Sequence, residues 1–246
     1  MVATDVDIAV RAARAAADEL VRLRQGGLTG RALGDAGDHV ANEAIWHAIV
    51  WERPEDVFFS EESADDLRRL TADRVWIVDP LDGTREYGEP GRHDWAVHVA
   101  LWSAGELTTA AVALPGLGEV LTTDPAPVVP SRSDGQVRIA VSRSRPPAVA
   151  DAVADALDAR LVPLGSAGYK TLAVVRGEVD AYVHAGGMYQ WDSAAPVAVA
   201  RAAGLTACRL DGSPLVYNDR DPWLPDLVVC RPELAEPILA AVRASS

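Results

Sequence analysis

The spacing of apolar positions divides the chain into two halves with different rhythms. In residues 5–25 apolar side chains recur every three or four positions and stop at Gly26-Gly27, which predicts an amphipathic helix, and a second helix is expected over residues 38–50. Short apolar runs at residues 57–59 and 74–78 predict strands. Three further runs predict an antiparallel meander, and they are residues 95–102, 107–114 and 119–123.

After a proline-rich connection at residues 124–136, strand and helix patterns alternate. The predicted strands are residues 137–142, 161–164, 179–184, 206–210 and 227–230. The predicted helices are residues 147–159, 167–176, 192–203 and 233–243. We therefore expect a layered α/β fold with a mixed, antiparallel first half and an alternating second half. The connection suggests an N-terminal α+β subdomain, residues 1–130, and a C-terminal α/β subdomain, residues 131–246.

Composition narrows the class of protein. A chain of 246 residues with 49% hydrophobic and 24% charged residues is an ordinary globular protein that can bury a sizeable core. Its net charge of −13 argues against a nucleic-acid polymer or an anionic membrane as partner, because both require clustered cations. An anionic substrate would need metal ions or a few well-placed arginines and lysines.

Two further features concern location and redox chemistry. Charged residues interrupt the first 25 positions, and no apolar run reaches membrane-spanning length, so we expect a cytoplasmic protein. Cys208 and Cys230 lack Cys-x-x-Cys spacing, which favours buried reduced thiols over a disulfide or a zinc site.

The segment Asp79-Pro80-Leu81-Asp82-Gly83-Thr84 follows a predicted buried strand. Two carboxylates three positions apart, followed at once by glycine, can face a cation while the next N–H groups stay free for an anion. This pattern indicates metal and phosphate chemistry. An ordinary turn is the alternative, because Asp-Pro and Asp-Gly are common turn sequences.

Other carboxylates lie where they can join this pair. Glu61 and Glu62 end the strand predicted at 57–59, and Asp192 opens a predicted helix. The alternatives are a solvated acidic turn for the two glutamates and a helix N-cap for Asp192.

Together these residues resemble a known family. Residues 60–63, 76–84 and 191–195 resemble the three signature segments of the inositol monophosphatase superfamily, which consists of magnesium-dependent, lithium-sensitive phosphatases. Asp-Gly-Thr-Arg-Glu-Tyr at 82–87 is similar to the 3′(2′),5′-bisphosphate nucleotidase (CysQ-like) branch, and residues 91–98 to its actinobacterial type. The resemblance spans nearly the whole chain and implies the layered αβαβα fold of the sugar phosphatases.

The resemblance also implies a metal site. Asp79 would bridge two Mg²⁺ ions, Glu61 and the Leu81 carbonyl would complete one site, and Asp82 and Asp192 would complete the other. Oxygen ligands of this kind suit Mg²⁺. Two or three ions are expected.

Catalytic roles follow from the same resemblance. Gly83 and Thr84 would hold a phosphate oxygen with their N–H groups. A water activated by metal, oriented by Thr84 and Glu61, would attack phosphorus in line, without a covalent intermediate. Asp38 falls where the family has a mobile loop near the third ion, but Asp35 stands in place of the family's threonine, and a helix N-cap is the alternative for Asp38.

Substrate contacts are expected from the second half. Lys170 is the only lysine among 23 lysine and arginine residues, and Gly165-Ser166 with Lys170 is similar to a nucleotidase segment whose lysine contacts the phosphate that is not hydrolysed. Chance placement is the alternative. Ser142 and Arg143 resemble a segment near the nucleotide, or a surface strand end. His184 is expected to line the same cleft or to be an ordinary strand-end histidine. Asp192 would contact substrate as well as metal.

The expected reaction is hydrolysis of the 3′-phosphate of adenosine 3′,5′-bisphosphate to AMP and phosphate, which would clear a by-product of sulfate activation. The alternatives are inositol-1-phosphate or fructose-1,6-bisphosphate as substrate on the same metal centre, and a non-catalytic sensor of a phosphorylated ligand. The sequence marks no interface, so monomer and homodimer both stay open.

Overall fold

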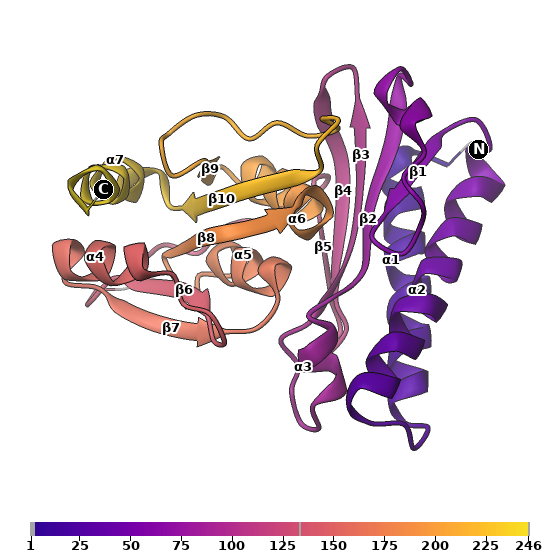
Figure 1. The fold of residues 1–246 in the computed structure, drawn as a ribbon, viewed down its shortest axis with the longest axis horizontal. Coiled ribbons are helices and arrows are strands. Elements are labelled where there is room, and N and C mark those ends of the chain that lie inside the picture. The colour runs from indigo at the N-terminus through magenta and orange to yellow at the C-terminus, as the bar shows by residue number, and fades with distance from the viewer. Residues whose placement is uncertain (1–2, 133, 246) are drawn as a thin grey trace.

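The computed structural model describes residues 3–132 and 134–245. Figure 1 shows two sheets that alternate with three pairs of helices, which gives five layers. In order across the molecule, the pairs are α1 (Asp5–Arg24) with α2 (Gly30–Glu52), α5 (Ala167–Val175) with α6 (Gln190–Ala202), and α4 (Ala148–Leu157) with α7 (Pro232–Ser245). The predicted αβαβα layering is confirmed.

The first sheet contains the strands of the first half in chain order. They are β1 (Val57–Ser60), β2 (Arg74–Asp82), β3 (Ala96–Ser103), β4 (Glu106–Leu114) and β5 (Glu119–Thr122). β1 runs parallel to β2 and the other pairs are antiparallel, so the predicted mixed sheet with its meander is confirmed. β2 extends beyond its predicted end, with a pairing irregularity between Asp79 and Asp82. The predicted turn is therefore an irregular strand end.

The second sheet has the order β7-β6-β8-β10-β9. Its strands are β6 (Arg138–Ser142), β7 (Arg160–Leu164), β8 (Ala181–Tyr189), β9 (Thr206–Cys208) and β10 (Trp223–Cys230). β8 continues through Gly186-Gly187, beyond its predicted end at residue 184. The reason is packing: Gly187 has a φ of +91°, and a Cβ there would lie 1.7 Å from the Trp223 ring on β10.

Helix α2 begins eight residues before its predicted start, so the loop expected at Asp38 is wrong. Gly34 and Gly37 both lie inside the helix, where it packs closely on residues 84–87. A Cβ on Gly34 would lie 2.6 Å from Thr84 Cγ2, and one on Gly37 would lie 2.8 Å from the Tyr87 ring. Asp38 is therefore an interior helical residue rather than an N-cap.

Three apolar clusters fill the spaces between the layers. The central one lies between the sheets and combines side chains from both halves of the chain, such as Phe59, Leu172 and Leu227. The division near residue 130 stays a prediction. Cys208 and Cys230 are free and buried in an outer cluster, as predicted. In the described residues, every helix is too short or too polar to cross a membrane.

Candidate active site

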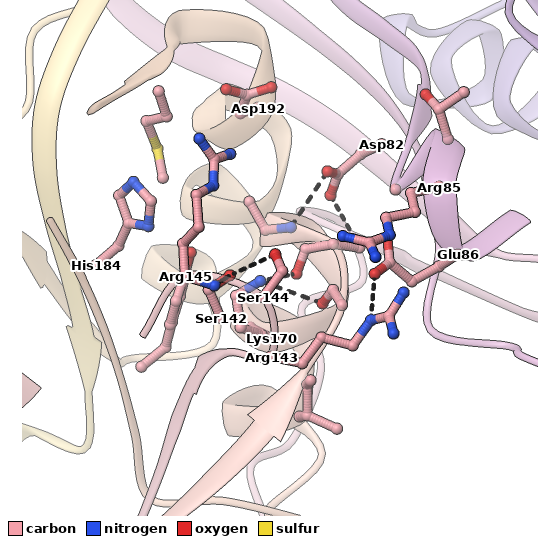
Figure 2. Close-up of a pocket in the computed structure, with 18 of the residues that line it drawn as sticks. Asp82, Arg85, Glu86, Ser142, Arg143, Ser144, Arg145, Lys170, His184 and Asp192 are labelled. Carbon is pink, nitrogen blue, oxygen red and sulfur yellow. Dashed lines mark hydrogen bonds and ion pairs between the residues drawn. The ribbon is translucent and has the colours of Figure 1, made fainter. Parts of the chain in front are cut away.

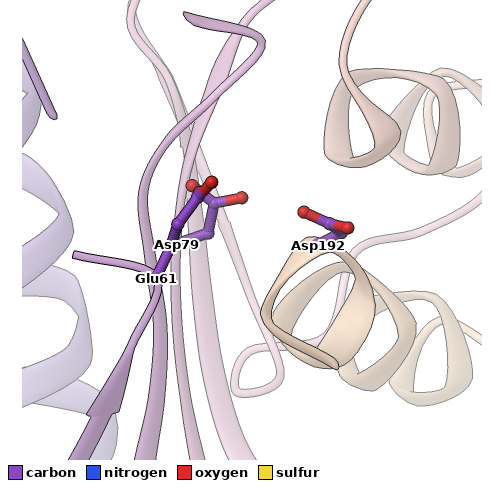
Figure 3. A group of neighbouring side chains, drawn as sticks. All are labelled: Glu61, Asp79 and Asp192. Atoms are coloured by element: carbon purple, nitrogen blue, oxygen red, sulfur yellow. The ribbon is translucent and has the colours of Figure 1, made fainter. Parts of the chain in front are cut away.

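Three carboxylates meet where the two halves of the molecule face each other. Glu61 directly follows β1, Asp79 lies in β2, and Asp192 is the third residue of α6. Figure 3 shows their side chains turned toward one another, and their carboxylate oxygens lie within 4.8 Å of one another. The sequence-predicted residues Glu61, Asp79 and Asp192 are thus brought together, and we call them the acidic cluster.

Mutual repulsion and burial dominate the electrostatics of the acidic cluster. Burial, followed by the charges of Glu61 and Asp82, raises the pKa of Asp79 well above its usual value. Burial and Asp82 raise the pKa of Asp192 to about 8, and burial, Asp82 and Glu62 raise that of Glu61 to about 7. Carboxyl groups in such an arrangement favour protonation or a cation. Because all three donors are hard oxygens, the cluster suits a divalent cation of the magnesium type.

Asp82 occupies a different position from the one expected. It accepts hydrogen bonds from the N–H groups of Ala167 (3.2 Å) and Gly168 (2.6 Å) and from the Ser166 hydroxyl, at the start of α5. Its carboxylate therefore caps α5 and stands beside the acidic cluster rather than within it. Through Asp82, the end of β2 is connected to the helices between the sheets.

Thr84 links the strand end to α2. Its hydroxyl lies 3.1 Å from the Leu81 carbonyl oxygen and 3.3 Å from Asp38 Oδ1, so it can donate to either. Burial, helped by the charges of Glu62 and Glu61, raises the pKa of Asp38 to about 7. Asp38, Thr84 and Leu81 are thus neighbours, while Gly83 turns the chain with a φ of +88°.

A cavity of about 490 Å³ adjoins the acidic cluster and shares Asp192 with it. Figure 2 shows its lining, which comes from the end of β2, from α3 (Thr84–Gly88), and from the second sheet with the start of α5. Every predicted substrate contact lines it, namely Gly83, Thr84, Ser142, Arg143, Gly165, Ser166, Lys170, His184 and Asp192. These residues therefore surround one cavity, and their contact with a substrate stays a prediction.

The basic residues of the cavity differ in how much of their charge is free. Lys170 is buried, and its Nζ donates to the carbonyls of Gly165 (3.2 Å) and Ser166 (2.6 Å). Burial lowers the pKa of Lys170 to about 8. Since an ammonium has three N–H donors, one remains for a ligand.

Arg143 and Arg145 contrast with each other. The Arg143 guanidinium donates to Glu86 and Glu89, at 2.6 Å each, which neutralises it. Arg145 has no ion-pair partner within the described part of the chain, and Figure 2 shows its guanidinium directed toward Asp192. Sequence reasoning singled out Arg143 and missed Arg145, although both belong to the same Ser-Arg-Ser-Arg segment.

Comparison with known proteins agrees with this site. A profile of the Inositol monophosphatase family matches residues 2–246. The chain belongs to the inositol monophosphatase family. The resemblance noted from the sequence is confirmed, and the family's use of metal ions agrees with the acidic cluster.

Relatives and solved structures refine this placement. The chain is 53% identical over 218 residues to the 3′-phosphoadenosine 5′-phosphate phosphatase of Mycobacterium tuberculosis, covering 85% of this chain and 82% of the relative. It is 30% identical over 200 residues to the 3′(2′),5′-bisphosphate nucleotidase CysQ of Escherichia coli K12, covering 77% and 81%. The crystal structure of staphylococcal IMPase-II shares the fold, with a TM-score of 0.82 at 18% identity over 99% of this chain and 95% of that one.

Within this member of the family, His98 is a further residue that sequence reasoning missed. It is fully buried in β3, opposite Asp79 in the strand register. Its Nδ1 lies 3.1 Å from the Trp191 carbonyl oxygen, and its Nε2 lies 3.4 Å from Asp82 Oδ2. Burial lowers the pKa of His98. A histidine within an otherwise apolar strand was the available signal.

His184 has a simpler position. Its Nε2 lies 2.9 Å from the Gly187 carbonyl oxygen, and its side chain forms one wall of the cavity. His184 thus bonds to its own strand and faces the cleft, and it is not a strand-end residue because β8 continues to Tyr189.

Proposed function

We propose that this chain is a Mg²⁺-dependent phosphatase that hydrolyses the 3′-phosphate of adenosine 3′,5′-bisphosphate to AMP and phosphate. The observation that carries the proposal is that Asp192 belongs both to the acidic cluster and to a cavity with an unpaired arginine. A bisphosphate needs both, one phosphate at the metal and one at a cation. The names of the mycobacterial and CysQ relatives support this substrate.

The acidic cluster would hold the metal with Glu61, Asp79 and Asp192, and Asp82, whose charge raises the pKa of all three, stands beside them. When bound, Mg²⁺ supplies charge neutralisation at the phosphate and lowers the pKa of water. Two or three ions are proposed, as the family resemblance implies.

Side chains near the acidic cluster are proposed to position the water that attacks the phosphate. Thr84 stands between Asp38 and the Leu81 carbonyl, which fixes its hydroxyl in place, and the charge of Glu61 acts on its partner Asp38. Asp38, whose pKa of about 7 lies near neutrality, is suited to share a proton with Thr84. We propose that Thr84 and Glu61 orient the attacking water, and that Gly83 lets the backbone approach the scissile phosphate.

Arg145 is proposed to hold the phosphate that is not hydrolysed. Arg143 is already paired with Glu86 and Glu89, and Lys170 uses two of its donors on Gly165 and Ser166. Arg85, which also lines the cavity, pairs with Glu89 at 3.4 Å. Among the cavity cations of the described residues, Arg145 therefore has its whole fork available, and an arginine fork matches phosphate geometry. Lys170 then supports the loop at Gly165 and adds its third N–H.

A phosphate-release assay tests the reaction. Adenosine 3′,5′-bisphosphate, inositol 1-phosphate and fructose 1,6-bisphosphate are each supplied with Mg²⁺ or with EDTA, and Asp192→Asn is the matched inactive control. We expect release from the adenosine bisphosphate with Mg²⁺ only. Faster phosphate release from inositol 1-phosphate or fructose 1,6-bisphosphate would make that compound the proposed substrate. Tight binding of a ligand without phosphate release would support a sensor.

A second assay tests the role of Arg145 by comparing two substrates. Arg145→Ala should reduce kcat/KM for adenosine 3′,5′-bisphosphate roughly 10- to 150-fold, because a charge-assisted hydrogen bond contributes about 1.5–3 kcal/mol. The same variant should leave kcat/KM for 3′-AMP, which lacks the second phosphate, nearly unchanged. Lys170→Met is the matched comparison: a selective loss there instead would return the phosphate contact to Lys170.

A further inference from the structure

A buried polar network lies behind the acidic cluster and begins at Arg69. This residue belongs to the 3-10 helix η1 (Leu67–Leu70) and has an exposed fraction of 0%. Its Nε and Nη2 donate to the two carboxylate oxygens of Asp65, at 2.7 and 3.0 Å. Asp65 lies on the segment that follows β1, four residues after Glu61. The Arg69 side chain therefore holds the segment that carries one member of the cluster.

The other side of Arg69 holds the segment before β10. Its Nη1 donates to Asn218 Oδ1 (3.1 Å) and to the Asp219 carbonyl (2.8 Å), and its Nη2 donates to the Arg220 carbonyl (3.2 Å). Asn218 Nδ2 donates back to the Arg69 carbonyl at 2.9 Å. Asn218 has a φ of +59°, a left-handed conformation that asparagine tolerates better than most residues. The two segments are thus joined in both directions.

Gln190 carries the connection to α6. The N–H of Asn218 donates to Gln190 Oε1 at 2.6 Å, and Gln190 Nε2 donates to the Asp221 carbonyl at 3.0 Å. Gln190 is fully buried and is the first residue of α6, two positions before Asp192. The network therefore runs from the segment of Glu61 to the helix of Asp192.

An aromatic route runs beside the polar one. The Arg69 guanidinium lies 4.2 Å from the centre of the Phe59 ring, and Phe59 meets Trp191 edge to face at 5.3 Å. Phe59 lies two residues before Glu61, and Trp191 one residue before Asp192. Both routes start at Arg69 and end within four residues of Glu61 and within two residues of Asp192 along the chain.

We propose that Arg69, Asn218 and Gln190 are positioning residues that hold Glu61 and Asp192 at the separation a divalent cation requires. The inference rests on metal binding by the acidic cluster, as proposed above. Glu61 and Asp192 come from separate elements and repel each other. Contacts of their own segments with the rest of the protein must therefore hold them in place. Groups behind metal ligands commonly control metal affinity in this way.

The variants are chosen to weaken the network without removing a ligand. Asn218→Gly keeps the left-handed backbone and the N–H bond to Gln190 but loses both bonds to Arg69. Gln190→Leu removes the bonds to Asn218 and Asp221 with little change in size. Arg231→Met is the matched control, because Arg231 is also buried and pairs with Asp180 at 3.3 Å, at the opposite end of β8 from α6.

Metal binding is measured by titration calorimetry with Mn²⁺ and Mg²⁺ and by the rise in Tm that each ion causes. We expect both network variants to bind metal about 10-fold more weakly. Their kcat should recover at high Mg²⁺, because the ligands themselves are intact. Arg231→Met should lower Tm but leave the metal Kd unchanged.

The outcomes separate this inference from the proposed function. A wild-type chain that binds no divalent cation overturns the proposed function and the inference with it. Wild-type binding with unchanged affinity in Asn218→Gly and Gln190→Leu overturns the positioning role alone. Equal weakening in Arg231→Met also overturns it, because the effect would then be general destabilisation. If Gln190→Leu does not fold, Asn218→Gly decides the question by itself.

Discussion

Raising the pH should destabilise the metal-free protein, and Mg²⁺ should abolish that effect. Burial and neighbouring carboxylates raise the pKa of Asp192 to about 8 and that of Glu61 to about 7, and they raise the pKa of Asp79 as well. A carboxyl whose pKa is higher in the folded than in the unfolded state retains its proton on folding. Its contribution to stability is therefore present at low pH and is lost as the pH rises from about 4 to about 8.

Asp192 sets the size of the effect. Its pKa moves from 3.8 to about 8, and each unit corresponds to about 1.4 kcal/mol, which gives an upper bound of roughly 6 kcal/mol. Because the three carboxyls titrate together, their separate shifts do not add. We expect a loss of roughly 3–5 kcal/mol between pH 5 and pH 8, and a fall in Tm of about 6–20 °C for a chain of this size.

Thermal melts from pH 5 to pH 8.5, in EDTA and in Mg²⁺, measure this loss. Asp192→Asn is the control, because it removes the charge and retains an acceptor for the Tyr189 N–H that Asp192 binds at 2.7 Å. At pH 8 without metal, this variant should be more stable than the wild type, and it should gain less from Mg²⁺. A wild-type Tm that is independent of pH in EDTA, or that falls equally in Mg²⁺, would refute the reasoning.

Three further outcomes are expected. Asp82→Asn should abolish turnover with an unchanged circular dichroism spectrum, because an amide cannot balance the charge of a second cation; wild-type turnover would contradict its role as a ligand. Millimolar Li⁺ should inhibit phosphate release uncompetitively with respect to substrate, as the family resemblance implies, and indifference to Li⁺ in steady-state assays would mean that the second metal site differs. Gly168→Ala should lower the free energy of unfolding in urea by about 1–3 kcal/mol, since its Cβ would lie 1.9 Å from His98 Nε2; an unchanged midpoint would show that His98 moves freely.

The spacing of apolar residues correctly predicted those helices and strands in which buried positions recur regularly along the sequence. Helix α1 follows from apolar spacing because it presents one face to a core cluster, and β3 and β4 follow from apolar runs because their two faces lie in two different core clusters. The start of α2 was missed because Gly34 and Gly37 favour loops locally, while their value here lies in close contact with Thr84 and Tyr87. Whether a glycine lies in a helix or a loop depends here on contacts with distant segments, and the neighbouring sequence carries no information about those contacts.

Glu61 and Asp79 were predictable because they lie at the ends of neighbouring predicted strands, and Asp192 because its segment resembles a family signature. Glu61, Asp79 and Asp192 converge as expected. Asp82 differs, since its position depends on donors from the start of α5, which is more than 80 residues away in the chain. The Arg69 network was invisible for the same reason: nothing near Arg69 in the sequence marks Asn218 as its partner.

Counting the lysines and arginines in the sequence also did not show which of these side chains is free to bind a ligand. Lys170 attracted notice because it is the only lysine, yet the structure commits two of its donors to carbonyls, and it commits Arg143 to two carboxylates. The cavity and the acidic cluster together contain five carboxylates and four cationic side chains. Once the acidic cluster has lost its protons, the metal-free site is therefore net negative and repels a polyanion. Divalent ions reverse that balance, so in that pH range metal should be needed for a bisphosphate to bind and not only for its hydrolysis.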